Sequence, residues 1–130
     1  MATFVVDGGL DIITNRLKGS GTEPLNVGWG TGAGTTARTD TTLFTEKDVD
    51  LSGAGPARTA GTSSRVTTTT TNDTYQVTAT RTATGAGTVT NAGLWDASSG
   101  GNLFLKGDFT GIGLASGDSI AFTFKAITDN

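Results

Sequence analysis

Threonine constrains this chain more than any other residue, because it occupies 27 of the 130 positions, and glycine follows with 20. The branched Cβ of threonine loses side-chain freedom in a helix and fits the pleated surface of a strand. Glycine supplies the tight turns between strands. The two residues together predict an all-β chain. The alternation of apolar residues described below argues against the other interpretation, a disordered polar linker.

Only the segment Asp7–Gly21 has the pattern of a helix. Leu10, Ile13 and Leu17 fall at the spacing of one helical face, and a glycine follows the last turn. We therefore expect one short helix over about residues 8–19. Its apolar stripe should pack against an edge of a sheet, because a helix this short needs tertiary contacts to hold it.

From about residue 25 to residue 128 the chain has the alternation of strands. Val27 and Trp29 share one face of a short strand. The last strand has the clearest pattern, with apolar residues at every second position: Ile120, Phe122, Phe124 and Ala126. The sequence predicts a single domain over residues 1–130, an antiparallel β-sandwich of jelly-roll-like type with one short N-terminal α-helix.

The stretch Ser63–Ala83 predicts a hairpin between two strands. Its two-residue turn would be Asn72-Asp73, because both residue types tolerate positive φ. The threonine run Thr67–Thr71 would then place hydroxyls on both faces of the first strand. Such a strand would lie at the edge of a sheet or be covered by a partner.

The composition excludes several kinds of chemistry. The chain has no Cys and no His, so it has no disulfides, no thiolate metal site and no histidine base for catalysis. A carboxylate pair of the glycosidase type remains open at Asp96 or Asp108, but each acid also fits a turn. We expect a protein that is not an enzyme and that needs no cofactor and no metal.

Two loops contain fragments of ligand-binding motifs. The alternating glycines of Gly28–Gly34 resemble a phosphate loop, but the Lys-Ser/Thr pair and the following helix are missing. The acidic segment Asp48–Gly53 matches the first half of a calcium loop, but Thr59 stands where the bidentate glutamate belongs. We therefore expect a solvated acidic loop and no phosphate site.

Charge and hydropathy bear on location. The net charge is −3, and the nine Lys and Arg residues are scattered singly, so no basic stripe is available for nucleic acid. No apolar run reaches the length of a membrane span, and the N-terminal MATFVVDGG lacks the cationic region of a signal peptide. We expect a soluble protein made in the cytoplasm that binds neither nucleic acid nor membrane.

The stretch AGTVTNAGLWDA at residues 86–97 ends a strand with two large apolar residues, Leu94 and Trp95. Neighbouring residues of a strand face opposite ways, so one of the two faces away from the core. We expect Gly93 to let the strand bend, Leu94 to point into the sandwich and Asp96 to tie the turn. Trp95 would then lie beneath the following loop or contact a neighbouring chain.

Exposed aromatic side chains on a β-sandwich can also stack on sugar rings. The candidates are Trp29, Tyr75 and Trp95. The alternation of Trp29 and Tyr75 with apolar neighbours fits core packing equally well. Sugar binding therefore remains open beside the packing interpretation.

Several motifs follow one another in an order that resembles a known family. The chain reads RLKG at the end of the expected helix, then LNVGWGTGAGTT, then DTTLFTE, and later VTTTTTNDTYQVTATRTATGAGTVTNAGLWDASSGGNLFLKGDF. This order resembles the small structural proteins of tailed bacteriophages, and the likeness covers Gly9 to about Phe124. In that family the corner usually reads Ala-Gly-Leu-Phe-Asp, whereas this chain has Trp95 in place of the phenylalanine.

The resemblance implies a virion component without enzymatic activity. We expect a capsid cement or decoration protein on the capsid surface, because the chain lacks the coiled coil that gives a fibre its length and trimerisation. Its partners would be the major capsid protein and copies of itself, most simply as a homotrimer at three-fold positions. The alternative is a tail-fibre or baseplate component that also binds host glycans. A small cellular binding module or enzyme is the third interpretation.

Our candidates for contacts with other subunits or with the capsid protein are Phe4, Trp29, Pro56, Arg58 and Trp95. Phe4 lies in the N-terminal stretch MATFVV, and Pro56 and Arg58 lie in the irregular connection Ala54–Ser63. We expect both stretches to be arms that become ordered only on binding.

Overall fold

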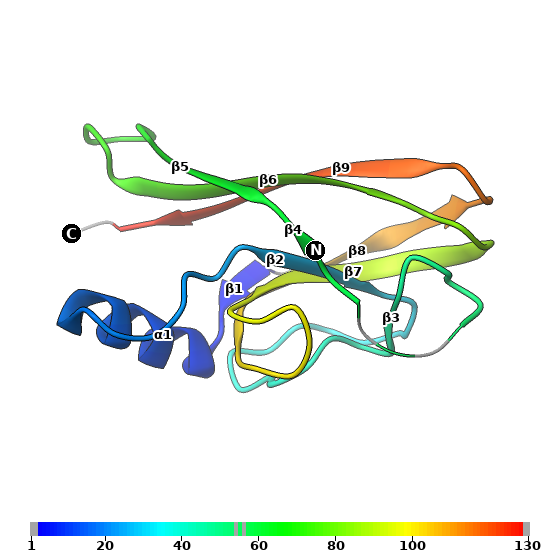
Figure 1. Ribbon diagram of the computed structural model, residues 1–130, viewed down its shortest axis with the longest axis horizontal. Coiled ribbons are helices and arrows are strands. Elements are labelled where there is room, and N and C mark those ends of the chain that lie inside the picture. Colours follow the sequence, from blue (N-terminus) through cyan, green and yellow to red (C-terminus); the bar gives the residue numbers. More distant parts are fainter. Residues whose placement is uncertain (1–2, 54, 56, 129–130) are drawn as a thin grey trace.

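The computed structural model describes residues 3–53, 55 and 57–128. Its elements are β1 (Thr3–Val5), α1 (Asp7–Lys18), β2 (Asn26–Gly30), β3 (Glu46–Lys47), β4 (Thr59–Ala60), β5 (Thr62–Val66), β6 (Thr74–Thr82), β7 (Gly87–Trp95), β8 (Leu103–Leu114) and β9 (Ser119–Ile127). Two sheets lie face to face (Figure 1). The large sheet has six strands in the order β1-β8-β7-β2-β3, with β4 also paired to β2, and the small sheet has three in the order β5-β6-β9. The predicted all-β sandwich with one short helix is confirmed.

The main hydrophobic core lies between the two sheets. Val27 and Trp29 of β2 are fully buried in it, as their alternation predicted. The last strand also behaves as predicted, because its apolar positions face this core and its intervening positions are exposed. β9 pairs with β6 along its whole length, from Thr82↔Ser119 to Thr74↔Ile127, without a register shift.

The helix forms where the sequence predicts it, but it packs on a different face. α1 buries Gly9 and Ile12, whereas Leu17 is 83% exposed and Leu10 is also exposed. The reason is a backbone contact, since a side chain at Gly9 would collide with the carbonyl of Phe104 in β8. That close approach sets which face of α1 meets the sheet. Among the described residues, no helix is long and apolar enough to cross a membrane.

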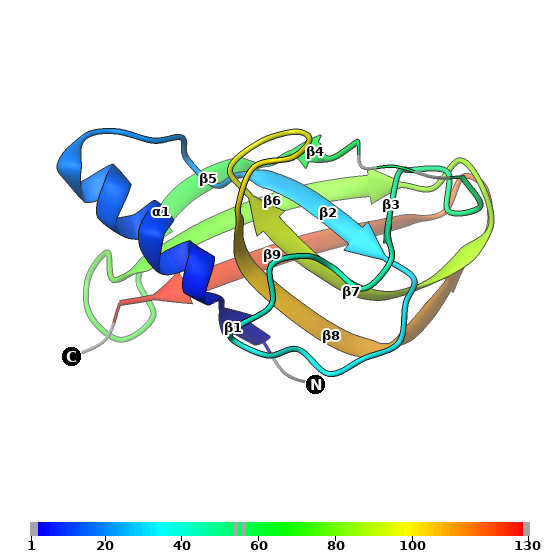
Figure 2. The ribbon, with the colours of Figure 1, turned by 90° about the horizontal axis from the view of Figure 1, so that it is seen from below.

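A cover of irregular chain lies on the outer face of the large sheet, away from the small sheet (Figure 2). It consists of the loops at residues 31–45 and 96–102. The buried ammonium group of Lys106 in β8 holds the first loop by donating to Asp40 Oδ2 at 2.8 Å and to the carbonyl of Thr42 at 2.9 Å. Burial alone would raise the pKa of Asp40, but the hydrogen bond from Lys106 and the other donors hold it below its usual value.

The predicted hairpin between β5 and β6 is present, but the prediction of a two-residue turn at Asn72-Asp73 is wrong. β5 ends at Val66 and β6 begins at Thr74, so the threonine run lies in a longer loop rather than in a strand. The carboxylate of Asp73 organises this loop by accepting the backbone N–H groups of Thr70, Thr68 and Thr69 at 2.8–2.9 Å. These hydrogen bonds hold the pKa of Asp73 well below its usual range.

Candidate assembly surface

A continuous strap, which we define as residues 57–66, crosses one long side of the sandwich. We call this side of the sandwich the closed edge. β4 pairs with β2 of the large sheet and β5 pairs with β6 of the small sheet, so the strap passes from one sheet to the other at Gly61. A side chain at Gly61 would lie 2.5 Å from Val77 Cγ1 and 2.9 Å from the carbonyl oxygen of Thr78. The crossing therefore requires glycine.

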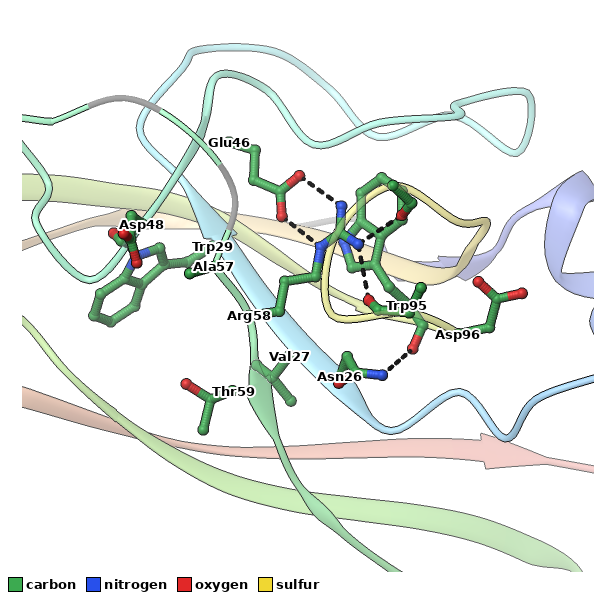
Figure 3. Close-up of polar contacts among 12 residues, drawn as sticks. Asn26, Val27, Trp29, Glu46, Asp48, Ala57, Arg58, Thr59, Trp95 and Asp96 are labelled. Carbon is green, nitrogen blue, oxygen red and sulfur yellow. Dashed lines mark hydrogen bonds and ion pairs between the residues drawn. The ribbon is translucent and has the colours of Figure 1, made fainter.

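Arg58 clamps the strap onto the large sheet (Figure 3). Its Nε and Nη2 donate to the two carboxylate oxygens of Glu46 at 2.8 and 3.0 Å, and Nη1 donates to the carbonyls of Ala97 and Gly100 at 2.9 and 2.7 Å. The guanidinium also lies over the indole ring of Trp95, 3.6 Å from the ring centre. With its side chain only 2% exposed, Arg58 acts inside the chain as a paired, stacked cation.

A second arginine, Arg81 of β6, holds the same strap from the core side. Its Nη1 donates to the carbonyl of Val27 at 2.9 Å and to Thr59 Oγ1 at 3.0 Å, and its guanidinium lies 4.6 Å from the ring centre of Trp29. Burial lowers the pKa of Arg81 to about 10, against the opposing effect of the carboxylates of Asp48 and Glu46. Arg81 is therefore still protonated at neutral pH.

The structure shows where the residues predicted to contact other subunits or the capsid protein lie. Trp29, Arg58 and Trp95 are buried inside the single chain, so their side chains are not available to a partner in this fold. Leu94 lies in the main core, while Trp95 lies in a second apolar cluster under the cover. Phe4 pairs with Lys106 in the register of β1 and β8 and is 38% exposed. Pro56 lies outside the described residues.

The prediction of arms that order only on binding is wrong for the described parts of both stretches. Thr3–Val5 is a strand paired with β8, and Thr59–Ala60 is a strand paired with β2. Backbone pairing within the chain already orders these segments, and the Arg58 clamp adds side-chain contacts. Local composition could not show this, because the pairing strands are distant in sequence.

The candidates for sugar stacking reduce to Tyr75, since both tryptophans are buried. Tyr75 lines a groove of about 440 Å³ between α1 and the ends of β6 and β9. Its hydroxyl lies 3.1 Å from Glu23 Oε1 and 2.9 Å from the carbonyl of Pro24. Burial and the nearby carboxylate of Glu23 raise the pKa of Tyr75. The hydroxyl is thus already engaged within the chain.

The fragments of ligand-binding motifs have structural roles. Asp50 Oδ1 accepts the backbone N–H of Ser52 at 3.0 Å and its hydroxyl at 2.7 Å, which forms a local turn. Side chains at Gly32 or Gly34 would collide with Phe44 of the cover. In the part of the chain that the structure describes, no three His, Cys, Asp or Glu side chains gather as metal ligands would.

The two acids considered for catalysis also hold loops. Asp96 Oδ1 accepts the backbone N–H of Asn102 at 2.7 Å, so Asp96 ties the turn as expected. Asp108 Oδ1 accepts the backbone N–H of Thr36 at 2.9 Å, which fastens the cover to β8.

On the other long side of the sandwich, between β8 and β9, no described residue crosses between the sheets, and we call this side the open edge. β1 pairs with β8 only from Leu105 to Gly107, and no described strand pairs with the outer edge of β9. A hollow of about 210 Å³ opens here between Phe109 of β8 and Phe122 of β9. Sequence analysis missed this surface, because alternation shows which face of a strand is buried but not which strand lies beside it.

A comparison with family models assigns the chain to a protein family. The model described as podophage GP4 fiber I protein gp80 matches residues 17–129, which include β2 to β9 and exclude β1 and most of α1. No curated protein and no solved structure matches the chain. The resemblance to structural proteins of tailed phages is confirmed. The chain, a β-sandwich closed along one edge and open along the other, therefore belongs to the podophage GP4 fiber I protein gp80 family of tailed-phage structural proteins.

Proposed function

We propose that this chain is a structural, non-enzymatic component of the tail fibre of a podophage. The observation that carries the proposal is the fibre-family match over residues 17–129. This match favours the tail-fibre alternative over the capsid cement protein that the sequence resemblance first suggested. The partners would then be other fibre or tail proteins rather than the major capsid protein.

The described side chains support a structural role. The buried cations Arg58, Arg81 and Lys106 all bind parts of the same chain and hold the strap or the cover in place. The two acids considered for catalysis fasten loops. The molecule therefore uses its polar interior to hold its shape, as a rigid module of a larger assembly requires.

The test is gold-labelled antibody against this protein on intact particles, viewed by electron microscopy. Label confined to the tail, in the small copy number of a fibre, is expected. Dense label over the head would overturn the tail-fibre proposal and restore the cement function, with the major capsid protein as partner. Particles carrying an epitope-tagged copy of the major capsid protein provide the control for access of antibody to the head.

The glycan-binding part of the tail-fibre alternative now depends on the groove beside Tyr75. This groove combines an aromatic ring with the charged side chains of Arg16 and Glu23, a combination that sugar sites use. A glycan array probed with the wild type and with Tyr75→Phe and Tyr75→Ala tests it. Binding kept by Tyr75→Phe and lost in a folded Tyr75→Ala variant is expected, and an array without binders would exclude the site.

A further inference from the structure

The outer edge of β9 is an unpaired strand edge. β9 runs from Ser119 to Ile127, and only its β6 side is paired in the part of the chain that the structure describes. Proteins usually protect such edges with proline, bulges or several charges. β9 has no proline, no register shift against β6 and a single charged residue, Lys125. This edge therefore presents a row of backbone donors and acceptors to another strand.

The large sheet extends beyond the small sheet on this side (Figure 2), where β8 lies beyond β9 on the side away from β6. Ile112 of β8 pairs with the core residue Val89, which places it on the inner face, yet it is 41% exposed. Phe109 and Phe122 are only partly buried beside the hollow at this edge. A strand paired with β9 would lie over this apolar surface and bury it.

The same overhang limits what can supply that strand. Stacked sheets lie about 10 Å apart, so a strand beside β9 has the overhanging part of β8 as its second layer. A strand from a folded sandwich brings a second layer of its own, and that layer would collide with β8. The opening therefore fits a single extended segment whose inner face is not already covered.

We propose that the open edge receives an extended segment of another protein, which pairs antiparallel with β9 and becomes the fourth strand of the small sheet. Its apolar side chains alternate with polar ones and lie over β8. It carries an acid opposite Lys125, because no acid among the described residues forms an ion pair with that ammonium group. That the partner is a fibre or tail protein rests on the proposed function, whereas the strand pairing does not.

A synthetic nine-residue peptide with blocked ends tests the pairing with the full chain. The peptide has valine at its even positions, threonine at its odd positions and glutamate at the third, which full-length antiparallel pairing places opposite Lys125. A peptide with lysine at the third position is the matched control. The glutamate peptide should bind up to about tenfold more tightly than the lysine peptide, and Lys125→Glu should reverse this order. Isothermal titration calorimetry measures each affinity.

N-methylation of the peptide shows whether its backbone makes the contact. In a strand, the N–H groups of alternate residues point to the same edge. Methyl groups on three even positions or on three odd positions therefore block one edge of the peptide and leave the other free. One of the two methylated peptides should lose binding, and the other should keep it.

The apolar surface of β8 is tested by Ile112→Ser, which should weaken the glutamate peptide several-fold. Leu10→Ser on α1 is the matched control, because Leu10 is similarly exposed, at 47%, but lies away from this edge. Circular dichroism checks the folding of both variants. These measurements use the purified chain, so their outcome is separate from the antibody test of the tail-fibre location.

Four results would each overturn the proposal. They are no binding of the glutamate peptide at about 1 mM, affinity that ignores the charge opposite Lys125, equal effects of the two methylation patterns, and equal losses in Ile112→Ser and Leu10→Ser. Hydrogen exchange of the chain without peptide is the last control. Protection of β9 that rises with protein concentration would assign the edge to a second copy and would also overturn the proposal.

Discussion

The closed and open edges of the sandwich complete the same two sheets in different ways. At the closed edge the strap crosses between the sheets, and Arg58 and Arg81 bind it through buried hydrogen bonds and stacking on tryptophan. At the open edge the sheets end at different widths, with apolar side chains and an unpaired strand on the outside. The difference indicates that contacts within the chain hold the closed edge, whereas the open edge leaves apolar side chains exposed in the part of the chain that the structure describes. Substitutions on the two edges should therefore have different consequences.

The largest expected effect is at the indole under the clamp. Trp95→Ala removes the surface on which the Arg58 guanidinium stacks and opens the second apolar cluster, which should cost about 3–5 kcal/mol of unfolding free energy. Trp95→Phe is the control, because it keeps an aromatic ring and should cost much less. Urea unfolding followed by circular dichroism measures both. A Trp95→Ala variant as stable as the wild type would show that the clamp does not hold the fold.

A smaller effect is expected from the acid of the clamp. Glu46→Gln removes the negative charge that balances the buried Arg58 guanidinium, and should cost about 3 kcal/mol because the cation stays buried without its counter-charge. Arg38→Gln is the exposed control, since Arg38 lies 3.9 Å from Asp7 with both side chains largely exposed. Thermal unfolding compares the two. Equal shifts in melting temperature would contradict the special role of the buried pair.

Two glycines give a direct comparison of the edges. Gly61→Ala at the closed edge places a methyl group 2.5 Å from Val77 Cγ1 and should cost about 1–3 kcal/mol. Gly113→Ala in β8 near the open edge meets nothing within 4 Å and should be neutral or slightly stabilising. Urea midpoints of the two variants measure the difference. A larger loss of stability in Gly113→Ala than in Gly61→Ala would contradict the conclusion that the closed edge is the more tightly packed of the two.

The smallest effect, and the one that depends on pH, is at the loop between β5 and β6. The pKa of Asp73 is lowered in the folded state, so its stabilisation is present above the unfolded value of 3.8 and is lost as the pH falls below it. Asp73→Asn should lower the melting temperature at pH 7. The melting temperatures of the variant and the wild type should converge as the pH falls below about 4. A difference that persisted or grew in acid would contradict the role of the carboxylate.

The sequence predicted those parts of the fold that depend on neighbours along the chain. The alternation in β2 and β9 gave the right buried faces, and the terminal glycine of α1 has the left-handed φ of 92° that ends a helix. The corner at Asp96 also formed as expected. The prediction from sequence failed where contact between distant segments decided the result. One example is the packing of α1 on β8, which takes place through Gly9 rather than through Leu17.

The candidate partner residues illustrate the same limit. Trp29, Arg58 and Trp95 have chemistry that suits interfaces as well as interiors, and only the positions of Arg81, Glu46 and the cover make them interior residues. The sequence did not mark Phe109 and Ile112 as residues of an open edge, because both look like ordinary strand residues. Their exposure follows from the small sheet having fewer strands than the large one.

The sequence by itself determined that this chain is a β-sandwich with one short helix, because threonine, glycine and period-two alternation act through local backbone preference. Its motif order also determined the phage structural family. Only the tertiary structure decided which edge is closed and which is open. The physical reason is that strand order and the burial of a cation such as Arg58 depend on segments far apart in the chain, whose contacts leave no local pattern.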